Sequence, residues 1–111
     1  MKEHSFHTVV LKGKNREKKK TVITFSDESY DIVSEFINGE LESFHREISN
    51  GLNRMKEDGV QARFAGSRLC FAANPDRTLI YEDGGEELRW QEIDTDEFIA
   101  LIDEWQKEAG R

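Results

Sequence analysis

The sequence predicts an α+β protein in which helices pack on one face of an antiparallel sheet. Three observations lead to this prediction. Short β-branched and aromatic runs alternate with turn residues, one long stripe of apolar residues has helical spacing, and the C-terminal segment is amphipathic. The chain has 111 residues, which is the length of one domain spanning residues 1–111. The expected order of elements is ββ-α-ββββ-α.

The first two strands are expected to form a hairpin. Residues 6–11 alternate as a strand does, and Val22 to Phe25 gives a second β-branched run. Gly13 and Asn15 suit a turn between them. The hairpin carries six cations, which are Lys12, Lys14, Arg16, Lys18, Lys19 and Lys20.

A helix, bent or broken, is expected over residues 27–56. Ser26 or Asp27 is a suitable N-cap, because a short side-chain oxygen accepts from a first-turn N–H group. The apolar stripe that follows has spacings of three or four residues: Tyr30, Val33, Ile37, Leu41, Phe44, Ile48, Leu52 and Met55. The pairs at 38–39 and 50–51 are both Asn-Gly, which favours a helix end or a kink. One bent helix and two consecutive helices both remain open.

The second half of the chain predicts a meander followed by a helix. Strands are expected near residues 60–64, 68–73, 78–81 and 86–91, with a type I turn at residues 74–77. Asp94 and Glu97 resemble a capping box at the start of the last helix. Trp105 continues the apolar stripe of that helix and is expected in the core.

Charge is distributed unevenly. The net charge is −7, yet residues 1–20 carry +5, and residues 82–108 hold eleven acidic side chains against two basic ones. Such an acidic segment repels nucleic acid phosphates and anionic lipid, and it attracts basic proteins in a salt-dependent manner.

The sequence gives little support for catalysis, and we expect no enzyme activity, no cofactor and no metal site. His4 and His7 would point to opposite faces of a strand, so they would not bind a metal ion together. No Cys/His cluster and no phosphate-binding glycine motif is present. Cys70 lies in an apolar strand and is expected to behave as a small hydrophobic residue. Because this single cysteine cannot form an internal disulfide, and no apolar run has the length of a membrane helix, the expected compartment is the cytoplasm, without a membrane partner.

Protein binding is the function that these features favour. Carboxylates that surround a large aromatic side chain can pair with the arginines of a basic partner while the aromatic ring is desolvated. The predicted partner-binding residues are Glu82, Asp83, Glu86, Glu87, Trp90, Glu92, Asp94 and Asp96. The alternative for Trp90 is a place in the core.

The chain as a whole, which is short, acidic, α+β and closed by EELRWQEIDTDEFIALIDEWQKE, resembles the small immunity proteins of bacterial polymorphic and contact-dependent toxin systems. That resemblance implies an inhibitor that covers the basic active site of a cognate toxin, such as a nuclease. A monomer or weak dimer is expected. Two alternatives stay open: a nucleic-acid-associated adaptor that uses the basic hairpin at 12–20, and an uncharacterised small-molecule-binding domain.

Overall fold

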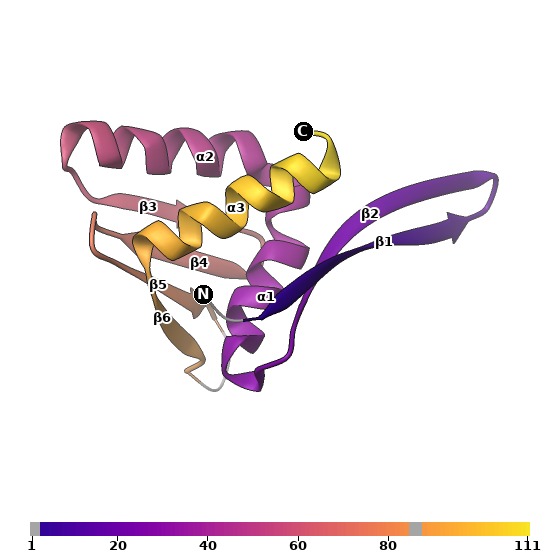
Figure 1. The fold of residues 1–111 in the computed structure, drawn as a ribbon, viewed down its shortest axis with the longest axis horizontal. Coiled ribbons are helices and arrows are strands. Elements are labelled where there is room, and N and C mark those ends of the chain that lie inside the picture. Colours follow the sequence, from indigo (N-terminus) through magenta and orange to yellow (C-terminus); the bar gives the residue numbers. More distant parts are fainter. Residues whose placement is uncertain (1–2, 85–87) are drawn as a thin grey trace.

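The protein consists of a long β-hairpin, a helical segment, a four-strand meander and a C-terminal helix (Figure 1), as expected for an α+β fold. The structure is a computed structural model, and it describes residues 3–84 and 88–111. In chain order, the elements are β1 (His4–Gly13), β2 (Arg16–Phe25), a 3₁₀ turn (Glu28–Tyr30), α1 (Asp31–Gly39), α2 (Leu41–Asp58), β3 (Ala62–Ala65), β4 (Leu69–Ala73), β5 (Arg77–Glu82), β6 (Trp90–Asp94) and α3 (Thr95–Ala109).

The strands form two antiparallel sheets, so the expectation of one sheet is wrong. Among the described residues, strands β1 and β2 pair only with each other, whereas β3, β4, β5 and β6 form a second sheet in that order. The side chain of Asn38 in α1 bonds the free edge of β2 at Ile23: its Oδ1 accepts from Ile23 N at 2.8 Å, and its Nδ2 donates to Ile23 O at 3.1 Å. This amide satisfies backbone groups that a further strand would otherwise bond.

The hairpin is anchored at its base and projects from the body at its turn (Figure 1). At the base, Trp105 Nε1 donates to Thr21 O at 3.2 Å, and the ring of His4 lies 2.6 Å from Glu104 Oε2. Ile23 is buried in the core, but residues 7–18 are all exposed. The distal part of the hairpin therefore packs against nothing within the described chain.

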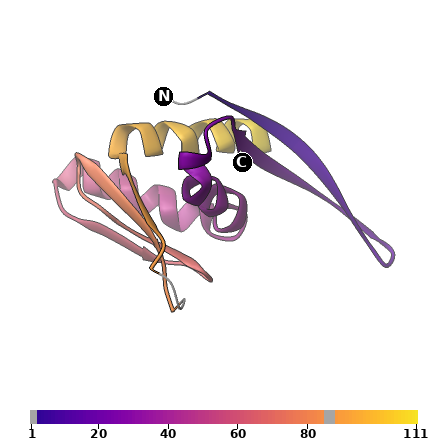
Figure 2. The same ribbon diagram turned by 90° about the horizontal axis from the view of Figure 1, so that it is seen from below.

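All three helices lie on one face of the four-stranded sheet (Figure 2). Four aromatic rings join these layers. Phe36 of α1 lies 5.9 Å from Phe64, 5.8 Å from Phe71 and 5.5 Å from Phe98, measured between ring centroids. Tilted and edge-on aromatic contacts of this kind add to the stabilisation from burial. Trp105 is completely buried in the same core, as its place in the apolar stripe predicts.

The segment at 27–56 contains two helices on one face of the sheet, which confirms one of the two predicted arrangements. The two helices are separated at Glu40, after the first Asn-Gly pair, and the backbone also leaves the helical region at Phe44 (φ −128°, ψ 19°) in the first turn of α2. The pair at 50–51 lies inside α2 without ending it. Around that second pair, Ile48, Leu52 and Met55 are buried. Core packing therefore outweighs the cost of a helical glycine, about 1 kcal/mol.

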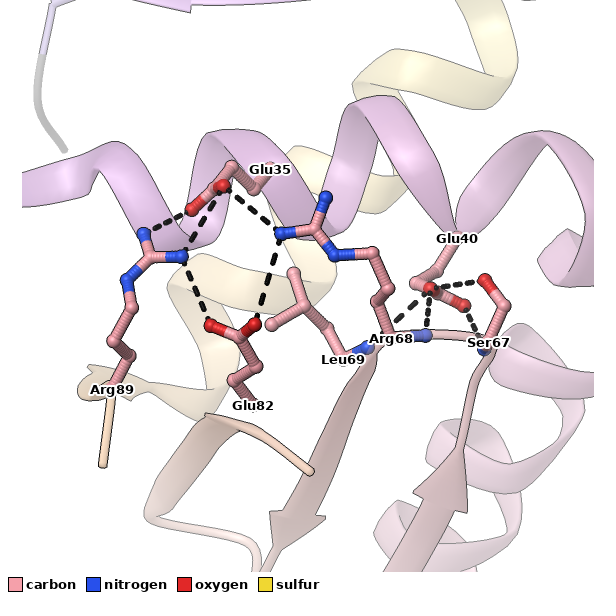
Figure 3. A network of polar contacts seen from close by, with 7 residues as sticks. All are labelled: Glu35, Glu40, Ser67, Arg68, Leu69, Glu82 and Arg89. Atoms are coloured by element: carbon pink, nitrogen blue, oxygen red, sulfur yellow. Dashed lines mark hydrogen bonds and ion pairs between the residues drawn. The ribbon is translucent and has the colours of Figure 1, made fainter. Parts of the chain in front are cut away.

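Glu40 at this break fixes the loop between β3 and β4 (Figure 3). Its side chain is buried, and its carboxylate accepts from Ser67 N at 2.9 Å, Ser67 Oγ at 2.9 Å and Arg68 N at 3.1 Å. Burial alone would raise the pKa of Glu40, but these hydrogen bonds to the charged form outweigh it and lower the pKa. A Cβ at Gly66 would lie only 2.0 Å from the carboxylate, so the loop requires glycine there.

Two predictions near the last helix are wrong in detail. The final strand begins at Trp90, not near residue 86, and residues 85–87 lie outside the described part of the chain. Asp94 is the N-cap residue of α3 but makes no side-chain capping bond, because its carboxylate pairs with Arg77. Glu97 does not complete a capping box and instead accepts from Tyr30 Oη at 2.8 Å.

Candidate functional site

The face of the four-stranded sheet that no helix covers contains the candidate site. Side chains alternate between the two faces of a strand, and the ring contacts of Phe71 place it on the helix side. The strand register then places Ile80 and its partner Gln91 on the helix side. The adjacent pair, Tyr81 and Trp90, lies on the opposite side. The opposite side therefore carries two large aromatic side chains that are not part of the buried core.

We define the Trp90 face as the side chains of Leu79, Tyr81, Leu88, Trp90 and Glu92, which together line a shallow hollow of about 440 Å³. Leu88 is 79% exposed and Trp90 is 55% exposed. The alternative prediction that Trp90 belongs to the core is therefore wrong. Large apolar side chains exposed side by side are typical of surfaces that bind a partner.

Glu92, Asp94 and Asp96 follow Trp90 along the chain, and each has a cationic neighbour. Arg77 Nη2 lies 3.4 Å from Glu92 Oε2, and Arg77 Nη1 also pairs with Asp94. These pairs raise the pKa of Arg77, chiefly through the hydrogen bond with Asp94. Asp96 pairs with Lys56 of α2. Glu92 and Asp94 thus share one cation next to the Trp90 face and leave one net negative charge there, whereas Arg63 lies on the same side of the sheet on β3, separated from β6 by two strands.

Glu82 is not part of this face. It belongs to a network on the helix side of the sheet (Figure 3), where Arg89 Nη1 lies 3.1 Å from Glu82 Oε2 and Arg89 Nη2 lies 2.5 Å from Glu35 Oε2. Arg68 approaches the same two carboxylates at 3.6 and 4.0 Å. The hydrogen bond with Glu35, followed by that with Glu82, raises the pKa of Arg89. This network joins α1 to the sheet.

Three other predicted residues precede Trp90: Asp83, which the structure describes, and Glu86 and Glu87, which lie outside the described residues. Asp83 is exposed just after β5. Glu86 and Glu87 lie outside the described residues, so only their charge and their position next to Leu88 in the sequence bear on the site. Of the eight predicted residues, the structure brings Trp90 and Glu92 together on the face and places Asp94 beside them through their shared partner, Arg77.

A second hollow, of about 510 Å³, lies between α2 and the end of α3 and is polar. Gln106 Nε2 donates to Ser49 Oγ at 2.7 Å, and both residues line the hollow. His45 also lines it, with a buried Nδ1 that has no hydrogen-bond partner among the described residues. The centroid of its ring lies 5.9 Å from that of the Trp105 ring, so His45 packs at the edge of the core.

Within residues 3–84 and 88–111, no three His, Cys, Asp or Glu side chains are placed to hold a metal ion together. Cys70 is a free, buried thiol. None of the described helices combines the length and the apolar character that a membrane span needs.

Comparison of the chain with protein-family models, with curated proteins and with solved structures gives no significant match in any of the three. The site is therefore interpreted from its own geometry.

Sequence reasoning found Trp90 but missed Leu79 and Leu88 as its neighbours. The signal was present in β5, where Leu79 and Tyr81 alternate with Thr78 and Ile80, so both faces of the strand are at least partly apolar. A strand of this kind is covered on both sides or exposes an apolar surface.

Proposed function

We propose that this protein is a non-enzymatic binding protein whose Trp90 face holds a basic protein partner. The observation that carries the proposal is the exposed apolar group of Trp90 and Leu88 on a rigid sheet, next to carboxylates that outnumber their cations. Aromatic anchors supply contact area, and the carboxylates select a cationic partner and accelerate association.

The class of partner that the resemblance implies is a toxin domain with a basic active site, which the protein would inhibit by covering it. Inhibition by covering needs no catalytic group on the inhibitor. A sheet face with an exposed aromatic ring suits this role, because binding requires little rearrangement of a sheet whose other face is packed by three helices.

The test starts with affinity capture from native lysate, using wild-type protein and three variants as bait at low and high salt. Trp90→Ala removes the anchor and Glu92→Gln removes one carboxylate of the face. Val60→Ala is the matched control, since Val60 is an exposed apolar residue, 49% accessible, in the turn before β3. Capture alone does not suffice, so the retained protein is purified and its own activity is measured with increasing amounts of each variant.

The expected result is one basic protein that wild type and Val60→Ala retain and inhibit equally. Trp90→Ala should weaken its binding by a hundredfold or more, which corresponds to about 2.7 kcal/mol. Glu92→Gln should mainly slow association and flatten its salt dependence. A partner that binds Trp90→Ala as tightly as wild type contradicts the proposed site.

One observation favours a second candidate, the nucleic-acid adaptor. Five of the six cations of the hairpin, all except Lys20, are exposed, and the hairpin projects from the body (Figure 1). A two-stranded ribbon fits the major groove of DNA. Reversing the charge of Lys18, Lys19 and Lys20 should then abolish salt-dependent binding to a labelled duplex, whereas Trp90→Ala should not.

A further inference from the structure

Six large hydrophobic side chains are exposed in the described part of the chain, and five of them belong to two surfaces. Two, Leu88 and Trp90, lie on the Trp90 face. Three others, Val9, Val10 and Leu11, are 39%, 45% and 49% exposed on the distal hairpin. We call residues 9–20 the basic ribbon. Exposed apolar residues gathered in this way are costly in water unless a partner covers them.

Each face of the basic ribbon carries both apolar and cationic groups, with Val10 opposite Lys19 on one of the two faces. In the register of the hairpin, Val9 lies opposite Lys20, Leu11 opposite Lys18, and Gly13 opposite Arg16. Directly opposed residues point to the same side of an antiparallel pair. One side of the ribbon therefore presents two apolar side chains beside a row of three cations, over a length of about 17 Å for five residues.

The Trp90 face is complementary in both respects. Its apolar residues match Val9 and Leu11, and within residues 3–84 and 88–111 the carboxylates of Glu92 and Asp94 share one cation, Arg77. Lysine and arginine also cover apolar surface with their aliphatic stems while their charged ends reach a carboxylate. A cationic ribbon on this face would thus bury apolar area and pair charges at once.

The two surfaces cannot meet within one chain as it is folded. The ribbon and the four-stranded sheet lie at opposite ends of the molecule in both views (Figures 1 and 2). The molecule measures 45 Å along its longest axis. Contact between them therefore requires a second copy.

We infer that the protein forms a reciprocal dimer in which the basic ribbon of each copy lies on the Trp90 face of the other. A single ribbon contact is small, and exchange between two copies doubles the buried area within a closed twofold assembly. The inference rests on the proposed function in that it uses the same face, and it makes the ribbon a competitor of the basic partner.

The test measures the mass of the purified full chain, free of nucleic acid, by sedimentation velocity over a wide concentration range at low and high salt. The ribbon variant is Lys18→Glu with Lys20→Glu, and the face variant is Trp90→Ala with Glu92→Lys. The control reverses Arg46 and Arg54, two exposed residues of α2, and so changes the net charge as much as the ribbon variant does. Circular dichroism checks that each variant is folded.

Wild type and the control are expected to dimerise, more weakly at high salt, and each double variant should raise the dimer dissociation constant at least tenfold. Mixing the two double variants should restore a one-to-one complex, because the mixture still offers one intact ribbon and one intact face. That complex should be weaker than the wild-type dimer, which has two such contacts.

Wild type that stays monomeric at millimolar concentration overturns the inference, and so does a dimer that both variants leave intact. Equal loss in the control would show a net-charge effect and also overturn it. A monomer whose ribbon binds labelled duplex DNA would assign the ribbon to nucleic acid instead. Loss of a basic partner by Trp90→Ala in a monomeric protein would leave the proposed function standing while the dimer falls.

Discussion

The two faces of the four-stranded sheet carry similar residues but have different surroundings. On the helix side, Phe64, Phe71 and Ile80 are buried under the three helices, whereas on the other side Leu79, Tyr81 and Trp90 have none of the described helices above them. The helix side contributes most of the core, because most of the sheet residues that lose contact with water lie there. The uncovered side adds apolar residues that stay at least partly exposed, and this difference is the reason why we propose a binding surface there.

The largest effect that would test this comparison is on stability. Phe71→Ala on the helix side should lower the free energy of unfolding by about 3–5 kcal/mol, because it leaves a cavity between three other aromatic rings. Trp90→Ala on the uncovered side should change it by only about 0.5 kcal/mol. Urea denaturation followed by circular dichroism measures both. A loss at Trp90 as large as that at Phe71 would mean that the two faces do not differ.

A smaller effect is expected at the loop that Glu40 holds against the helical break. Glu40→Gln keeps the size of the side chain but turns an amide towards backbone donors, so it should cost about 1.5–3 kcal/mol. Glu47→Gln, at an exposed position in α2, is the control and should be neutral. Gly66→Ala provides a second test, because its methyl group would collide with the same carboxylate.

The pH dependence of the Glu40 effect has a defined sign. Because folding lowers the pKa of Glu40 below its usual value of 4.5, the stabilisation is complete above that value and is lost as the pH falls through the lower, folded pKa. The difference in unfolding free energy between wild type and Glu40→Gln should therefore shrink as the pH is lowered from 5 through the folded pKa of Glu40. A constant difference would contradict the role of the carboxylate charge.

The burial of Cys70 gives a further test of the difference between the two faces of the sheet. Cys70 alternates with Phe71 and so lies on the uncovered side, yet it is only 3% exposed. Tyr81 lies directly opposite it on β5. Tyr81→Ala should speed the reaction of Cys70 with a thiol reagent at least tenfold in the native protein, whereas Tyr81→Phe should not. An unchanged rate in Tyr81→Ala would mean that other groups shield the thiol.

The smallest expected effect is on the ionisation of one side chain on the helix side, the hydroxyl of Tyr30. Burial, the hydrogen bond to Glu97 and nearby carboxylates raise the pKa of Tyr30 to about 12. Its contribution to stability is therefore complete below pH 10 and is lost as the pH rises towards 12. Absorbance at alkaline pH should show a tyrosine with this late midpoint, and Tyr30→Phe should remove it. A midpoint near 10 for Tyr30 would show that its hydroxyl is solvated.

Local sequence patterns predicted most of the helices and strands, because hydrophobic periodicity and the preferences of turn residues depend on only a few neighbouring residues. The stripe from Tyr30 to Met55 and the turn at Asn74, whose Oδ1 accepts from Asp76 N and Arg77 N, are both present. The capping box failed because Asp94 has a long-range partner, Arg77, that no local pattern shows. The separation into two sheets likewise depends on Asn38, an amide that ends the pairing of β2 from a different element.

The candidate site could be predicted only in part for a related reason. Neighbours in the acidic stretch alternate between faces, so Glu82 and Glu92 lie on opposite sides of the sheet although they are close in sequence. A linear count of charge cannot separate them. The exposed state of Trp90 also depends on which face the helices cover, and strand periodicity alone leaves that choice open.

The freedom of the distal hairpin has a consequence for how this chain tolerates changes in length. Pairing between β1 and β2 continues without a bulge from His4 opposite Phe25 to Gly13 opposite Arg16. Removing two residues from each strand near the turn would keep every remaining pair in register and leave the anchored base untouched. Insertions of the same kind would lengthen the arm equally well. The hairpin is thus the part of the protein whose reach can change between variants without repacking the interior.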